Sequence, residues 1–111
     1  STAEAEYMAA ADATADIMWL RSILQELGFT QVGPTTLRGD NRAAKIWSKD
    51  CIINENNKHI RIRYHIVRDS TRDGTVSLDW VESKNNIADL LTKPLAAPQF
   101  ERLRERLMGC V

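Results

Sequence analysis

Three carboxylates of this 111-residue chain lie among apolar or small neighbours. Glu6 lies in AEAEYMAA, Asp40 in TTLRGDNRAA and Asp89 in NNIADLLTKPL. An acidic side chain in such surroundings is costly unless it is paired or binds a cation. Carboxylate oxygens are ligands that hard divalent cations prefer. The three residues therefore predict a divalent cation site, and with it hydrolysis or group transfer at phosphate.

Two of these acids also have a purely structural explanation. Glu6 falls near the start of a predicted helix, where an acid interacts favourably with the helix dipole. Asp40 directly precedes another predicted helix, where it would serve as the N-cap. Capping and metal binding are compatible, because acids at strand ends in α/β folds often face the functional site.

The elements that would position these acids follow from hydrophobic periodicity and from glycine and proline. Gly28, for example, predicts the end of the first helix. Four helices are predicted, over Ala3–Leu27, Arg42–Ser48, from Ile87 to before Pro94, and from Pro98 onward. Strands are predicted over Thr35–Asp40 and Thr75–Val81. The first helix has an apolar stripe formed by Ala10, Ala13, Ile17, Leu20, Leu24 and Leu27. This stripe extends backward to Glu6 and not to Glu4, so Glu6 is predicted to face the core or a cleft.

The segment 58–66 is ambiguous. Its strict alternation weakly favours a strand. Continued toward the C-terminus, the same segment also gives a helical face with Ile60, Tyr64, Val67 and Thr71 on one side. Periodicity alone leaves both structures open.

The composition is that of one small domain spanning 1–111. Lys and Arg total 15 and Asp and Glu total 15, so net charge indicates no partner. Cys51 and Cys110 have no metal-ligand spacing, which favours a reduced, intracellular protein. No secretory leader or membrane-spanning run is evident, so secretion and a membrane are not expected. The chain begins without methionine and looks cut from something longer.

Four segments in series resemble the C-terminal ribonuclease H domain of copia-type retrotransposon polyproteins. They are STAEAEYMAA, GDNRAA, KHIRIRYHIVRD and NNIADLLTKPL. The resemblance covers nearly the whole chain in the same order. It implies an α/β ribonuclease H-like fold, in which KHIRIRYHIVRD is a helix rather than a strand.

The resemblance also implies an activity, namely Mg²⁺-dependent hydrolysis of the RNA strand of RNA/DNA hybrids, with Mn²⁺ as a substitute metal. Glu6, Asp40 and Asp89 match three of the four catalytic, metal-binding carboxylates of that family. The implied partners are the RNA/DNA hybrid, the reverse transcriptase and the rest of the polyprotein. The implied location is a cytoplasmic particle or the nucleus.

This sequence departs from the family pattern at its start. The family's first carboxylate and first three strands have no counterpart here. We therefore expect a two-strand remnant sheet packed with helices, an exposed apolar helix face, and an isolated chain that is weak or inactive. A homodimer through the uncovered sheet or helix face is also expected. The alternative function is a non-catalytic, retrotransposon-derived module that binds nucleic acid or protein.

A basic segment is a second candidate site. Phosphate contact would explain it, because hybrid binding needs sequence-independent contacts to the backbone, but an ordinary solvated face is about equally expected. The predicted nucleic-acid-binding residues are Asn41, Lys58, Arg61, Arg63 and Arg68, with Arg72 nearby. The tryptophans Trp19, Trp47 and Trp80 are expected to pack in or beside the core.

Overall fold

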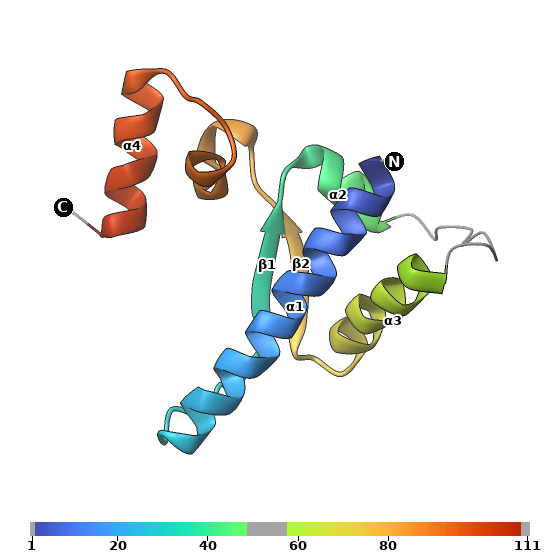
Figure 1. Ribbon diagram of the computed structural model, residues 1–111. Coiled ribbons are helices and arrows are strands. Elements are labelled where there is room, and N and C mark those ends of the chain that lie inside the picture. The colour runs from blue at the N-terminus through green and yellow to red at the C-terminus, as the bar shows by residue number, and fades with distance from the viewer. Residues whose placement is uncertain (1, 49–57, 110–111) are drawn as a thin grey trace.

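The computed structural model describes residues 2–48 and 58–109 as a mixture of helices and strands (Figure 1). The α/β class predicted from the sequence is confirmed. In chain order the elements are α1 (Thr2–Glu26), β1 (Thr35–Gly39), α2 (Asn41–Ser48), α3 (Lys58–Arg72), β2 (Val76–Trp80), the 3₁₀ helices η1 (Ser83–Asn85) and η2 (Ile87–Leu91), and α4 (Ala97–Met108).

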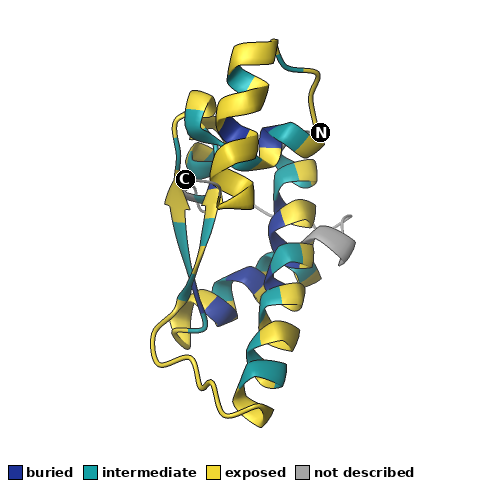
Figure 2. Ribbon diagram, turned by 90° about the vertical axis from the view of Figure 1, so that its left-hand side faces the viewer, coloured by how far each residue is buried: buried dark blue, intermediate teal, exposed yellow. Residues whose placement is uncertain are grey.

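The two strands form a parallel pair, in the register Thr35↔Val76 to Gly39↔Trp80. A parallel pair needs a crossover rather than a hairpin, and α2 and α3 lie in this connection. Leu37 and Leu78 pack against the core. On the other face, Ser77 Oγ donates a hydrogen bond to Thr36 Oγ1 at 3.3 Å. The alternation gives the sheet one apolar face, and α1 lies along that face (Figures 1 and 2).

The core is built where α1 meets α3. Ala10 and Ala11 of α1 and Val67 of α3 are its buried centre, with Leu37, Trp47 and Leu78 packed against it. Small side chains allow the two helices to approach closely. Two polar groups of α1 have hydrogen-bond partners. Thr14 Oγ1 donates within the helix to Ala10 O at 2.7 Å, and Tyr7 Oη donates to Ile46 O of α2 at 3.0 Å.

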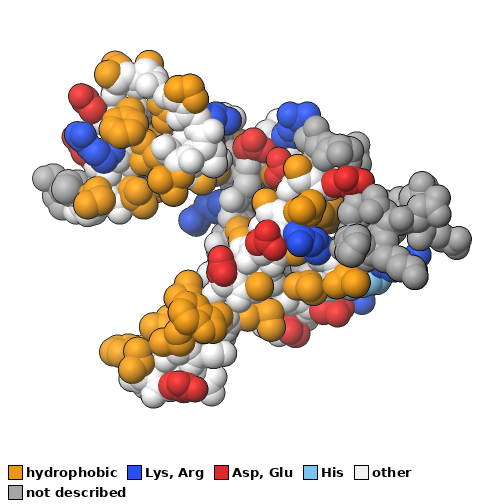
Figure 3. All heavy atoms as spheres, viewed as in Figure 1, with side chains coloured by type: hydrophobic (Ala, Val, Ile, Leu, Met, Phe, Trp, Pro, Cys, Tyr) orange, Lys and Arg blue, Asp and Glu red, His pale blue; other side chains and the backbone are white. Residues whose placement is uncertain are grey.

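The predicted apolar stripe of α1 is buried only in its N-terminal part. Ala10 is buried, but Leu20 is 51% exposed and Leu27 is 66% exposed. Figure 3 shows hydrophobic side chains gathered at this far end of the helix. The radius of gyration is 15.7 Å, whereas a compact chain of this length would have about 13 Å. The exposure of Leu20 and Leu27 shows that the exposed apolar helix face expected from the sequence is present.

The strand favoured by alternation over 58–66 is wrong, because Lys58–Arg72 forms helix α3. The helix expected from the family resemblance is correct. Val67 and Ser70 are buried, Tyr64 is half-buried, and Ile62 and Ile66 are exposed. Packing against α1 decides between the two periodicities, because only the helix turns Tyr64 and Val67 to one side.

In the C-terminal third, helices begin where the sequence predicts them, but one of them is of a different type. The helix expected from Ile87 is a 3₁₀ helix, capped by Asn86, whose Oδ1 accepts from Ala88 N at 3.3 Å. Helix α4 begins at Ala97, with Pro98 in its first turn. Proline suits this position because its missing N–H would have no partner there.

The tryptophans differ in their packing. Trp47 is half-buried against the core, as expected. Trp80, at the end of β2, lines a pocket together with Trp47 but is 51% exposed. The expectation is wrong for Trp19, which is 65% exposed.

Gly39 fixes the junction of β1 and α2, directly before Asp40. A Cβ at this position would lie 2.5 Å from Trp47 Cη2 and 2.8 Å from Ala43 Cβ. We expect Gly39→Ala to lower the free energy of unfolding by about 1–3 kcal/mol, because overpacking forces neighbouring atoms apart. Chemical denaturation would measure the change.

The matched control is Gly33→Ala, where an added Cβ meets nothing within 4 Å. This change should be neutral or stabilising by up to about 1 kcal/mol. Equal stabilities of the two variants would contradict the proposed packing at Gly39.

Candidate functional site

The three predicted carboxylates line one cleft. This cleft has a volume of about 370 Å³ and lies between α1, the end of β1, the start of α2 and the segment around η2. Glu6, Asp40 and Asp89 all contribute to its wall. Each acid therefore comes from a different part of the chain, and the fold brings them to a common space.

Glu6 enters the cleft from α1. The neighbouring lining residues Ala9, Ala10 and Ala13 are small, so they leave the space in front of the helix open. Glu6 is half-buried and forms no hydrogen bond or ion pair within the described part of the chain. Its carboxylate is thus available to a ligand.

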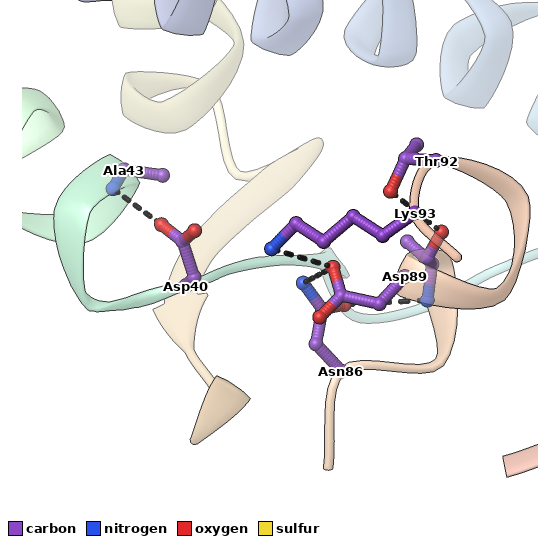
Figure 4. Close-up of polar contacts among 7 residues, drawn as sticks. Asp40, Ala43, Asn86, Asp89, Thr92 and Lys93 are labelled. Carbon is purple, nitrogen blue, oxygen red and sulfur yellow. Dashed lines mark hydrogen bonds and ion pairs between the residues drawn. The ribbon is translucent and has the colours of Figure 1, made fainter. Parts of the chain in front are cut away.

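Asp40 follows β1 and caps α2. Its Oδ1 accepts a hydrogen bond from Ala43 N at 2.8 Å, and its carbonyl oxygen accepts from Ala44 N at 3.0 Å. This is the N-cap arrangement expected for aspartate before a helix. Figure 4 shows the carboxylate turned toward Ala43. Asp40 is therefore the N-cap of α2, and this role occupies one of its two carboxylate oxygens.

Asp89 is the most buried of the three, with 6% of its surface exposed. Its Oδ1 accepts from Asn86 Nδ2 at 3.4 Å and lies 3.5 Å from Lys93 Nζ (Figure 4). A buried carboxylate needs such partners. Sequence reasoning missed Lys93, although its spacing of four residues from Asp89 was a usable signal.

The cleft has the ligand type of a Mg²⁺ site but not its close spacing. Among residues 2–48 and 58–109, no group of three or more His, Cys, Asp or Glu side chains is arranged to hold a metal ion. Metal ligation by Glu6, Asp40 and Asp89 therefore stays a prediction. Lys93 supplies the positive charge beside Asp89 in this structure.

Helix α3 separates the basic residues onto two sides. Arg61, Arg68 and Arg72 are seven and four residues apart and share one side of the helix. Arg68 Nε donates to Tyr64 Oη at 2.9 Å, and its guanidinium lies 5.1 Å from the centre of that ring. Arg63 is on the other side, where it pairs with Asp12 of α1 at 3.5 Å.

The remaining predicted nucleic-acid contacts are Asn41 and Lys58. Asn41 is exposed at the start of α2, beside Asp40. Lys58 begins α3, and its side chain lies outside the described part of the structure, as do Cys51 and Cys110. On the basic side of α3, Arg61 and Arg72 are exposed and Arg68 is half-buried, whereas Arg63 is on the opposite side. Nucleic-acid binding by the predicted residues stays a prediction.

Comparison with known proteins identifies relatives along nearly the whole chain. The chain is 31% identical over 107 residues to the retrovirus-related Pol polyprotein from transposon RE1 of Arabidopsis thaliana, and 30% identical over 107 residues to that from transposon RE2. It is 35% identical over 105 residues to the Pol polyprotein from transposon TNT 1-94 of Nicotiana tabacum. The homologues of this chain are retrotransposon Pol polyproteins.

These matches cover 95–96% of this chain but only 7–8% of each relative. The chain therefore corresponds to a short segment of each of these relatives. No protein-family model and no solved structure matches the chain significantly. Within the described residues, no helix is both long enough and apolar enough to span a membrane.

Lys93 should compete with a cation for Asp89. We expect Lys93→Met to tighten Mn²⁺ binding by up to roughly fivefold, because a partly exposed ion pair is worth about 1 kcal/mol or less. Asp89→Asn should weaken Mn²⁺ binding. Titration calorimetry would measure both effects.

Lys84→Met is the matched control, because Lys84 pairs with Glu82 at 3.2 Å and lines none of the cleft. It should leave Mn²⁺ binding unchanged. Identical binding by wild type, Lys93→Met and Asp89→Asn would mean that Asp89 is not a metal ligand.

Proposed function

We propose that this chain is the C-terminal part of a ribonuclease H-like domain in a copia-type Pol polyprotein, and that the domain hydrolyses the RNA strand of RNA/DNA hybrids. The observation that carries the proposal is the single cleft lined by Glu6, Asp40 and Asp89. The homology to Pol polyproteins supports this context. The same three residues match the family's carboxylates in the sequence.

The proposed roles follow from the chemistry of carboxylates. Glu6, Asp40 and Asp89 would hold Mg²⁺, or Mn²⁺ in its place, through hard oxygen atoms. The metal would activate a water molecule and stabilise the leaving oxygen at phosphate. Asn86 would orient Asp89, because its amide already donates to that carboxylate.

The surroundings of the cleft support a requirement for more of the polyprotein. The sheet has two strands, and two strands are a marginal sheet by themselves. The apolar side of α1 around Leu20 and Leu27 is exposed. We propose that preceding strands of the polyprotein cover this side and supply the fourth carboxylate. Without them, a homodimer could bury the same surface.

A second function is favoured by the state of Asp89. Its pairing with Lys93, and the wide spacing of the acids, suit a non-catalytic module that binds nucleic acid or protein. In that case Lys93 would be a permanent partner of Asp89 rather than a competitor of the metal. The two functions differ in whether hybrid cleavage depends on the carboxylates.

Cleavage of a labelled RNA/DNA hybrid in Mg²⁺ tests the enzymatic proposal. We expect a longer polyprotein segment, containing the preceding strands, to cleave the RNA strand. The chain 1–111 alone should be about a hundredfold slower or inactive, because misplaced reacting groups cost about that much.

Asp40→Asn and Asp89→Asn in the longer segment should abolish cleavage. Glu4→Gln is the matched control on α1, because Glu4 does not line the cleft, and it should retain activity. Cleavage that survives Asp89→Asn would favour the non-catalytic function for this site.

The exposed side of α3 gives a separate prediction for hybrid binding. Arg61→Ala should weaken binding and lower the salt dependence by about one counterion, because Arg61 is exposed and has no partner among the described residues. Arg63→Ala is the control on the same helix, since Arg63 already pairs with Asp12. Equal effects in fluorescence anisotropy would contradict a specific role for this side of α3.

A further inference from the structure

A second cavity adjoins the carboxylate cleft. It has a volume of about 490 Å³ and is lined by polar side chains from three separate elements: Arg38 of β1, Asn85 and Asn86 around η1 and η2, and Arg106 of α4. Arg38, Asn86 and Ala88 line both cavities. The two spaces are therefore neighbours, separated by the segment that carries Asn86.

The second cavity differs from the first in charge. The first is lined by three carboxylates, whereas no acidic residue is among the described residues that line the second. Arg38 and Arg106 are both exposed, and neither guanidinium forms a hydrogen bond or ion pair within the described ranges. Two unpaired arginines facing one cavity form a positive site.

The third polar group of this cavity is held in place. Arg102 Nη1 donates to Asn85 Oδ1 at 3.0 Å, and Arg102 Nη2 donates to Lys84 O. The acceptor atom of the Asn85 side chain is thus occupied, while its amide nitrogen donates to no described partner. The Asn85 amide and both guanidinium groups offer donors, which suits an anion.

We propose that Arg38, Asn85 and Arg106 bind a backbone phosphate of a nucleic-acid strand whose neighbouring phosphate lies at the carboxylate cleft. Guanidinium groups form bidentate hydrogen bonds to phosphate oxygens. The volume of the cavity exceeds that of a single phosphate, and the cavity adjoins the cleft. Both features suit a nucleic-acid strand that passes through the two spaces. This inference rests on the proposed function, because it assigns the neighbouring phosphate to the carboxylates.

Binding of a fluorescein-labelled RNA/DNA hybrid to the chain 1–111 tests the proposal. Measurement in EDTA makes binding independent of metal. We expect Arg38→Gln and Arg106→Gln each to weaken binding by about tenfold at low salt, since charge-assisted hydrogen bonds have this strength. The slope of log affinity against log salt should fall by about one for each arginine.

Arg104→Gln is the matched control. Arg104 lies on the same helix, carries the same charge and stacks on Phe100, with 5.8 Å between its guanidinium carbon and the ring centre. It does not line the cavity, so its loss should change affinity by less than about twofold. Circular dichroism would verify that all variants fold alike. Equal losses for Arg104→Gln and Arg106→Gln would overturn the proposal.

Inorganic phosphate distinguishes a strand from a free anion. We expect phosphate to shift the side-chain amide NMR signal of Asn85 in the wild type but not in the Arg38→Gln, Arg106→Gln double variant, and to compete with the hybrid. A phosphate effect on Asn85 without any loss of hybrid affinity in the double variant would overturn the assignment to nucleic acid. Failure of the wild-type chain to bind hybrid in EDTA would also overturn it.

The result is separable from the proposed function. Asp40→Asn and Asp89→Asn should not weaken hybrid affinity in EDTA, because these acids do not line the arginine cavity and, without a metal ion, their negative charge repels the neighbouring phosphate. Loss of hybrid affinity in the arginine variants, without Mg²⁺-dependent cleavage by the longer segment, would support the phosphate site and reject the nuclease. Mg²⁺-dependent cleavage by the longer segment, together with unchanged hybrid affinity of the arginine variants, would support the nuclease and reject the phosphate site.

Discussion

The close contact of α1 with α3 and the two strands is the constraint on which the rest of the structure depends. Ala10 and Ala11 meet Val67 of α3, and Leu37 and Leu78 of the strands pack against this centre. Side chains this small allow close approach, but they bury little apolar area per residue. The contact fixes the direction of α1, and with it the position of Glu6 over the end of β1.

The same contact leaves much of α1 without a partner. The core is made by the N-terminal part of the helix, whereas its far end presents large hydrophobic side chains to solvent (Figures 2 and 3). An exposed surface of this kind is typical of an interface rather than of an isolated domain. The short share of each Pol polyprotein that the chain matches is consistent with this property.

Electrostatics divide the region at the end of β1 into two parts. On one side, three acids line a cleft and Lys93 balances the buried Asp89. Arg38 lines this cleft too, and together with Arg106 it lines a second cavity that no described acid lines. Asn86 lies between them and donates to Asp89. This arrangement suits a ligand that carries repeated negative charge and needs a cation at only one position.

The sequence by itself determined the elements that depend on local interactions. Gly28, Asp40 and Pro98 predict a helix end, a cap and a helix start, and the structure has each feature in place. These residues act on their own backbone, so no distant contact is needed to identify them. The family resemblance, rather than periodicity, gave the correct helix for α3.

Tertiary structure alone decided the features that join distant segments. Packing on α1 determined which periodicity of α3 is expressed, and it placed Arg63 against Asp12, away from Arg61. The common cleft of Glu6, Asp40 and Asp89 was inferred from their types, but its width and the place of Lys93 were not. Arg38 and Arg106 gave no signal in the sequence, because β1 and α4 line the same cavity only in the folded chain.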